Sequence, residues 1–196
     1  MKKLFLVGAL ALFGAVNAQT SGFEGRTFVT GTAQYNSSTD NLKNETTSKT
    51  AFVPTVGYFI SPTVAIGAGV GYEGKTVKYS NDNKNTVSSF VFQPMIRKYW
   101  GVANNFYLFG QFDVPMAWGS EKSTVAGNST TSNKVSSFGF YLRPGVDYFI
   151  TNNWSVEATV GAFGYQSVKP EGGKSTDNAT VGLNLGNLGL GIKYLF

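Results

Sequence analysis

The last nine residues of the chain, Leu188-Gly-Leu-Gly-Ile-Lys-Tyr-Leu-Phe196, decide its fold. Every second residue is apolar: Leu188, Leu190, Ile192, Tyr194 and Phe196. Glycine or lysine lies between them at positions 189, 191 and 193. Because alternate side chains of a β-strand point to opposite faces, this period of two predicts a strand with one apolar face and one polar or small face.

The other end of the chain indicates export. Lys2 and Lys3 precede an apolar run over residues 4–16, and Val16-Asn17-Ala18 supplies small residues at the cleavage positions. This pattern predicts a secretory signal peptide over residues 1–18, because the run is too short and wrongly flanked for a transmembrane helix. The mature protein is expected to be a single domain over residues 19–196.

Composition excludes several classes of protein. The net charge is +5 and the basic residues are dispersed, so no nucleic-acid partner is expected. The chain has no cysteine to form disulfides, and it lacks histidine, the commonest general base and metal ligand. We therefore expect neither an enzyme nor a bound cofactor or metal. After the signal peptide no apolar run reaches the ~20 residues of a membrane helix, so a membrane-spanning form must be a closed barrel.

A weak repeat divides the mature chain into strands. Residues 52–59, 92–99 and 142–149 each carry a proline followed by apolar and aromatic residues, and each precedes a short turn signal. Polar stretches at 36–48, 80–85, 120–133 and 169–178 are typical of solvated loops. Three short turns alternating with four longer loops predict an all-β fold, an eight-stranded antiparallel up-and-down transmembrane β-barrel.

The expected strands cover residues 26–35, 50–60, 63–79, 86–100, 105–119, 134–150, 153–168 and 180–196. Prolines 54, 94 and 144 fall inside three of them. Since a closed barrel has no edge strand to accommodate a missing N–H group, we expect β-bulges at these prolines.

Charges distinguish the two faces of each strand. In the strand at 134–150, Phe140 and Leu142 alternate with Arg143 and Asp147. A cation facing lipid at the midplane costs about 2–4 kcal/mol, so the charged face is expected to line the lumen. The apolar face is expected to meet lipid, including residues 154, 156, 158, 160 and 162 of the seventh strand, with interfacial aromatics Tyr58, Trp100, Trp118, Tyr148 and Trp154. Lys98 falls on the lipid face, near a strand end from which its amine can reach the interface.

A soluble barrel of the lipocalin type would invert this arrangement, with apolar residues inside and polar residues in water. The apolar faces here are too aromatic and too continuous to be solvated. The membrane barrel is therefore the favoured interpretation.

The inward face collects charges of both signs: Arg97, Arg143 and Lys193 against Glu73, Asp113, Asp147 and Glu157. They predict either a structural network of ion pairs, or a binding site or ion path. Because side chains can fill an eight-stranded barrel, the structural network is favoured. We expect Asp113 or Asp147 to pair with Arg143.

Together these features resemble the small outer-membrane barrels of the OmpA/OmpX type and a generic outer-membrane β-barrel domain. The terminal set Leu190, Ile192, Tyr194 and Phe196 resembles the C-terminal signal that the barrel-assembly machinery reads. The resemblance implies a bacterial outer-membrane location, outer-membrane lipids as partners, and an extracellular ligand at the loops over 36–48, 80–85, 120–133 and 169–178. It implies a structural or surface-interaction, adhesin-like role, with a narrow channel as the alternative and an outer-membrane enzyme as a further one.

Overall fold

The computed structural model describes residues 22–42, 44–79, 83–125, 128–182 and 188–196. The expected signal peptide at residues 1–18 lies outside these ranges. Within them the regular structure is entirely antiparallel β-strand. None of the described residues forms a helix long and apolar enough to cross a membrane.

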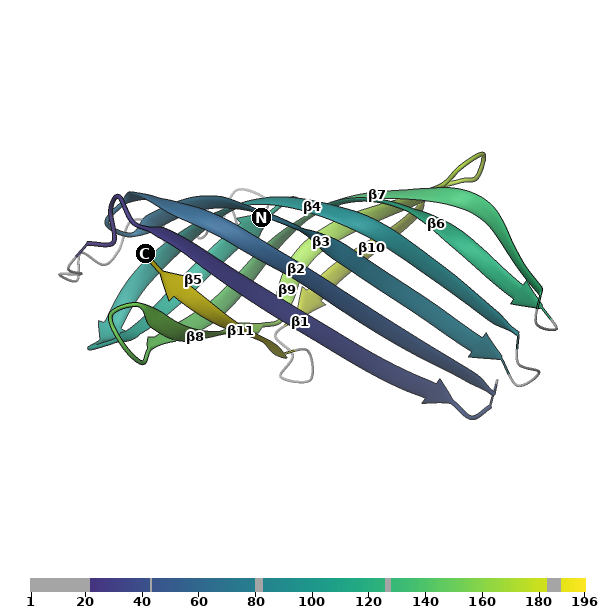
Figure 1. Ribbon diagram of the computed structural model, residues 1–196, viewed down its shortest axis with the longest axis horizontal. Helices are drawn as coiled ribbons and strands as arrows, with labels where there is room; N and C mark the ends of the chain where they lie inside the picture. Colours follow the sequence, from purple (N-terminus) through teal and green to yellow (C-terminus); the bar gives the residue numbers. More distant parts are fainter. Residues whose placement is uncertain (1–21, 43, 80–82, 126–127, 183–187) are drawn as a thin grey trace, which may run out of the picture.

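The strands are β1 (Thr27–Asp40), β2 (Glu45–Ser61), β3 (Val64–Tyr79), β4 (Lys84–Ala103), β5 (Phe106–Asp113), β6 (Met116–Val125), β7 (Asn128–Phe149), β8 (Trp154–Val160), β9 (Ala162–Pro170), β10 (Thr176–Gly182) and β11 (Leu188–Leu195). Figure 1 shows β1 to β4 running obliquely side by side along the length of the molecule.

These strands form a ring of eight spans. β5 and β6 form one span, because both pair with β4 in one register and with β7 on the other side. β8 and β9 form the next span beside β7, and β10 and β11 form the last. The ring closes where β1 pairs with β11, from Phe28 opposite Leu195 to Thr32 opposite Gly191. The expectation of an eight-stranded antiparallel barrel is confirmed.

Two of the four polar stretches, 36–48 and 120–133, are mostly strand where the sequence predicted loops. β1 and β2 pair without interruption from Thr27 opposite Tyr58 to Asp40 opposite Glu45, so most of residues 36–48 is strand. Residues 120–133 likewise lie largely in β6 and β7. Cross-strand hydroxyl pairs, such as Ser37 with Ser48 and Thr39 with Thr46, favour the extended backbone there. The strands therefore run on as hairpins at one end of the barrel (Figure 1).

The bulges expected at the prolines are not where the sequence predicted them. The register is unshifted across Pro54 and Pro94, and register shifts lie at residues 59–61, 101–103 and 120–122. The interruption falls instead in a neighbouring strand. Val114 donates its N–H to the carbonyl of Pro94 at 3.0 Å, in the gap between β5 and β6. The strand beside Pro144 is divided at Gly161, a glycine with φ of 78°.

Gly161 also reverses the faces of its span. Trp154 and Val156 face outward in β8, whereas Phe163 does so in β9. The extra residue at Gly161 shifts the alternation by one position, so Ala162 leaves the lipid-facing set in which the sequence placed it.

Candidate functional site: the filled lumen

An aromatic cluster fills the lumen at the turn end of the barrel, where the short turns connect the strands. Its buried members are Phe23, Phe28, Phe59, Ala65, Met95, Tyr99, Phe109, Phe149 and Leu195. Phe23 precedes the first strand, and its ring stacks on Phe149 with centroids 5.2 Å apart. Backbone hydrogen bonds from Phe23 to Pro62 and from Gly25 to Phe59 hold this segment against the barrel. The segment therefore closes the turn end from inside.

Glycines on neighbouring strands make room for these rings. A Cβ atom at Gly57 would collide with the ring of Phe28, and one at Gly145 with the ring of Phe109. Both are cross-strand neighbours in the register. An aromatic ring lying over a glycine compensates for the apolar contact that the glycine lacks.

Arg97 of β4 is the centre of the polar part of the lumen. Its side chain is 4% exposed and forms an ion pair with Glu157 of β8, which is 2% exposed, at 2.6 Å. The same guanidinium donates to Gln111 Oε1 at 2.6 and 3.0 Å and to the Tyr99 hydroxyl at 3.0 Å. Thr30 of β1 donates to Glu157 at 2.9 Å. These bonds tie four spans of the barrel together through its interior.

A second ion pair extends the network towards the loop end. Arg143 of β7 donates from Nε to both carboxylate oxygens of Asp113, at 2.9 and 3.2 Å. Gln111 bridges the two pairs, because its amide nitrogen donates to Asp113 at 2.9 Å. Asp113 is one of the two partners that the sequence proposed for Arg143. The Arg143 side chain is 27% exposed, so it forms the solvent-facing end of the network.

The third ion pair lies deeper. Lys193 of β11 pairs with Asp147 of β7, and both side chains are fully buried. Lys193 also donates to the Tyr99 hydroxyl at 3.3 Å, which joins this pair to Arg97. Within the described residues, Oδ1 of Asp147 and Oγ of Ser155 are buried without a hydrogen-bond partner. Six of the seven charged residues predicted from sequence thus lie in one connected network.

Glu73 stands apart from the other six. It lies in the loop half of β3, opposite Ala51 and Ser89, and no ion pair joins it to the network among the residues that the structure describes. Glycines 67, 69 and 71 share its face of β3 on the side of the network, whereas Lys75 follows on the same face and lies opposite Lys49 of β2, so the lysines of this face lie on the hairpin side of Glu73. Alternation placed Glu73 on the correct face but could not give its partner.

The outer face carries the predicted lipid-facing residues. Tyr58, Trp118, Tyr148 and Trp154 are exposed, and Trp100 is partly covered. Leu190, Ile192 and Phe196 are exposed along β11, and Tyr194 packs edge-on against Trp154 and Phe196, each at 4.8 Å. Lys98 donates to Thr63 at 2.6 Å, at the turn end of the barrel.

Paired charges and aromatic rings occupy the lumen at the turn end of the barrel. Arg97, Arg143 and Lys193 each contact a carboxylate, and aromatic rings surround Arg97, including Phe109 at 4.2 Å. No group of three or more carboxylates suited to a metal ion gathers anywhere in the described ranges.

Comparison with known proteins agrees with this architecture. The model of the outer membrane protein beta-barrel domain family matches residues 5–196, and the chain belongs to this family. The resemblance deduced from sequence is therefore confirmed. No curated protein sequence matches the chain.

Two solved structures share the fold at low identity. Neisserial surface protein A is 15% identical with a TM-score of 0.52, and the alignment covers 88% of this chain and 100% of that protein. The outer membrane protein OprG from Pseudomonas aeruginosa is also 15% identical with a TM-score of 0.52, with 91% of this chain and 99% of that protein covered. At this identity the comparison supports the fold alone.

Proposed function

We propose that this protein is a closed, non-conducting outer-membrane barrel with a structural or surface-interaction role, acting through its outer face and its projecting hairpins. The observation that carries this proposal is the filled lumen. Three ion pairs and the aromatic cluster occupy the turn half of the barrel, where an eight-stranded wall leaves little additional width. Membership in the outer-membrane β-barrel family supports the location.

The hairpins supply the surface for an interaction. β1, β2, β4 and β7 have 14, 17, 20 and 22 residues, whereas a tilted strand crosses a membrane with about 9–11. Paired hydroxyls and exposed lysines cover these extensions. A paired hairpin loses less conformational entropy on binding than a flexible loop, so it suits recognition of an external ligand.

Planar-bilayer conductance tests the closed lumen. The wild-type barrel should show negligible or flickering conductance, and replacing Arg97 and Tyr99 by glycine should raise it. Lys98→Gly is the matched control, because Lys98 lies between them in β4 but faces outward. A steady, large conductance of the wild type would overturn the proposal.

A narrow channel is the second candidate, and one observation favours it. The unpaired Asp147 and Ser155 atoms mark polar positions inside the plug, where water can bind and link the ion pairs. Such a route would conduct protons or water more readily than larger solutes. A conductance that persists for protons alone would support it.

An outer-membrane enzyme has less support. The chain has no histidine, and the adjacent acids Asp147 and Glu157 are engaged by Lys193 and Arg97. These carboxylates therefore have a simpler role as partners of buried cations.

A further inference from the structure

A shallow groove lies on the outer face of the barrel, across β3, β4, β6 and β7. Its volume is about 450 Å³, and Tyr72, Phe90, Trp118, Ser88, Ser120 and Lys134 line it. The register explains its shape. Tyr72 lies opposite Phe90 and Phe90 opposite Trp118, which makes an aromatic row. Two residues further along these strands towards the hairpins, Ser88 lies opposite Ser120, and Ser120 lies opposite Lys134. Small serines between larger neighbours leave the hollow.

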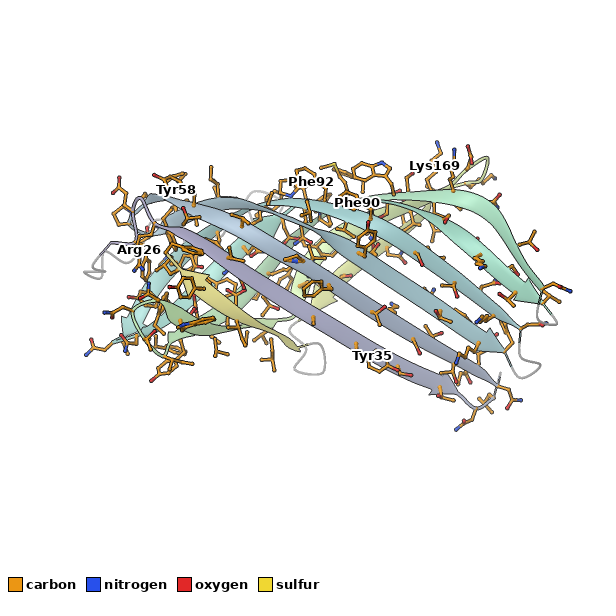
Figure 2. All side chains as sticks on the ribbon, in the orientation of Figure 1. Arg26, Tyr35, Tyr58, Phe90, Phe92 and Lys169 are labelled. Atoms are coloured by element: carbon orange, nitrogen blue, oxygen red, sulfur yellow. The ribbon has the colours of Figure 1, made fainter. Side chains whose placement is uncertain are left out.

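Five exposed lysines continue the rim of this groove around the barrel: Lys78, Lys84, Lys122, Lys134 and Lys169. They lie on β3, β4, β6, β7 and β9, which are consecutive neighbours at the hairpin end. Each shares the outward phase of its strand with an exposed or partly exposed aromatic residue: Tyr72, Phe90, Trp118, Phe138 and Tyr165. Figure 2 shows Lys169 on the outer surface beyond Phe90, towards the hairpin end.

The height of the lysines above the aromatic row matches a headgroup. Lys122 and Lys169 follow Trp118 and Tyr165 by four positions, and Lys134 precedes Phe138 by four positions on the antiparallel strand between them. At about 3.3 Å per residue this is about 13 Å along the strand, or about 9 Å along the membrane normal for a tilt of about 45°. Aromatic residues mark the membrane interface, so the lysines lie at the level of lipid phosphates.

The outward positions between the two rows carry no carboxylate. On these five strands they hold glycine, serine and threonine only, and all are among the residues the structure describes: 74, 76, 86, 88, 120, 136 and 167. On these five strands, therefore, no acid lies between the lysines and the aromatic row; Asp177, opposite Ser167, and Glu171, bonded through its N–H to the Lys134 carbonyl, lie at the β9 and β10 edge of the row. Several amines above an apolar floor complement a ligand with more than one negative charge and an apolar tail.

We propose that this groove and lysine row bind a phosphorylated glycolipid of the outer leaflet. The acyl chains lie along Phe90 and Trp118, the sugar lies over Ser88 and Ser120, and a phosphate meets Lys134. The serine hydroxyls can exchange hydrogen bonds with sugar hydroxyls. A soluble polyanion would leave the aromatic floor unused, and a lipid with one phosphate would contact only part of the row. The inference does not depend on whether the lumen conducts.

Native mass spectrometry of the detergent-purified full chain tests this. The probes are bis-phosphorylated lipid A, the same lipid with both phosphates removed, phosphatidylglycerol, and inositol hexakisphosphate as a soluble polyanion. Bis-phosphorylated lipid A should bind most tightly. Lys134→Ala should weaken it about fivefold, the effect of one lysine beside an anionic lipid. Ser120→Phe should also weaken it, because it fills the hollow without changing charge.

Lys98→Ala is the matched control, since it removes one outward lysine at the turn end and should leave binding unchanged. Heat-dependent mobility on a gel shows that each variant is folded. Equal binding of phosphatidylglycerol would mean a general attraction of anionic lipid, and equal binding of inositol hexakisphosphate would mean a soluble ligand. Either result, or equal weakening by Lys98→Ala, would overturn the proposal.

Discussion

Arg97 offers the sharpest test of how the lumen is stabilised. Arg97→Met removes the cation but keeps an apolar side chain of similar length among the surrounding rings. Glu157, 2% exposed, then keeps the Thr30 hydroxyl as a hydrogen-bond donor but loses its ion-pair partner. Leaving one member of a buried pair unpaired costs about 3–5 kcal/mol. The free energy of unfolding should fall by that amount.

The double variant Arg97→Met with Glu157→Gln should recover much of the loss. The glutamine carries no charge, and its side-chain oxygen can still accept from Thr30. Gln111 Oε1 accepts from Arg97 in the native barrel, so this oxygen lacks its donor in the double variant. An unsatisfied buried group of this kind costs about 1–3 kcal/mol. The double variant should therefore be about 2 kcal/mol more stable than Arg97→Met alone.

Urea titration of barrels refolded in phospholipid vesicles, followed by tryptophan fluorescence, measures these differences. The cycle is completed by Glu157→Gln, which leaves the guanidinium bound only to neutral partners and should also be destabilising. Additive costs, with the double variant as unstable as the sum of the two single variants, would refute the reasoning. Such a result would mean that the two charges contribute independently to the free energy of unfolding.

Three further outcomes are expected. Arg143→Met should cost less than Arg97→Met in the same titration, because Arg143 is 27% exposed and water can reach the Asp113 carboxylate; an equal cost would contradict this. The folded barrel should resist SDS and migrate differently before and after heating, since its backbone hydrogen bonds are internal; identical mobility would count against closure. Deleting Phe196, which is 63% exposed, should reduce membrane-inserted protein in cells but leave refolding into detergent largely unchanged. Equal loss in both settings would indicate a packing role for Phe196.

The sequence by itself determined the class of fold and the two faces of its wall. Alternation with a period of two is a local property of a strand, so residues 188–196 specified an apolar and a polar face without any knowledge of neighbours. The cost of charge in lipid then assigned Arg97 and Asp147 to the interior. The alternation of three short turns with four longer polar stretches predicted the number of spans.

Local patterns did not predict where the alternation would change. No local pattern indicated that Gly161 shifts the phase of its span, because a bulge depends on the partner strand. For the same reason the interruptions near Pro94 and Pro144 fell in neighbouring strands. The polar residues at 36–48 read as a loop, yet pairing with a partner extended them as a hairpin.

Only the tertiary structure decided which groups meet across the lumen. Arg97 and Glu157 are 60 positions apart and three spans apart in the ring, so their contact depends on the stagger of all the strands between them. The aromatic cluster depends on Phe23, which no strand pattern includes, and on glycines 57 and 145 lying beside the rings. Alternation fixes the side of the wall on which a residue lies, whereas strand stagger and curvature fix the partner it meets there.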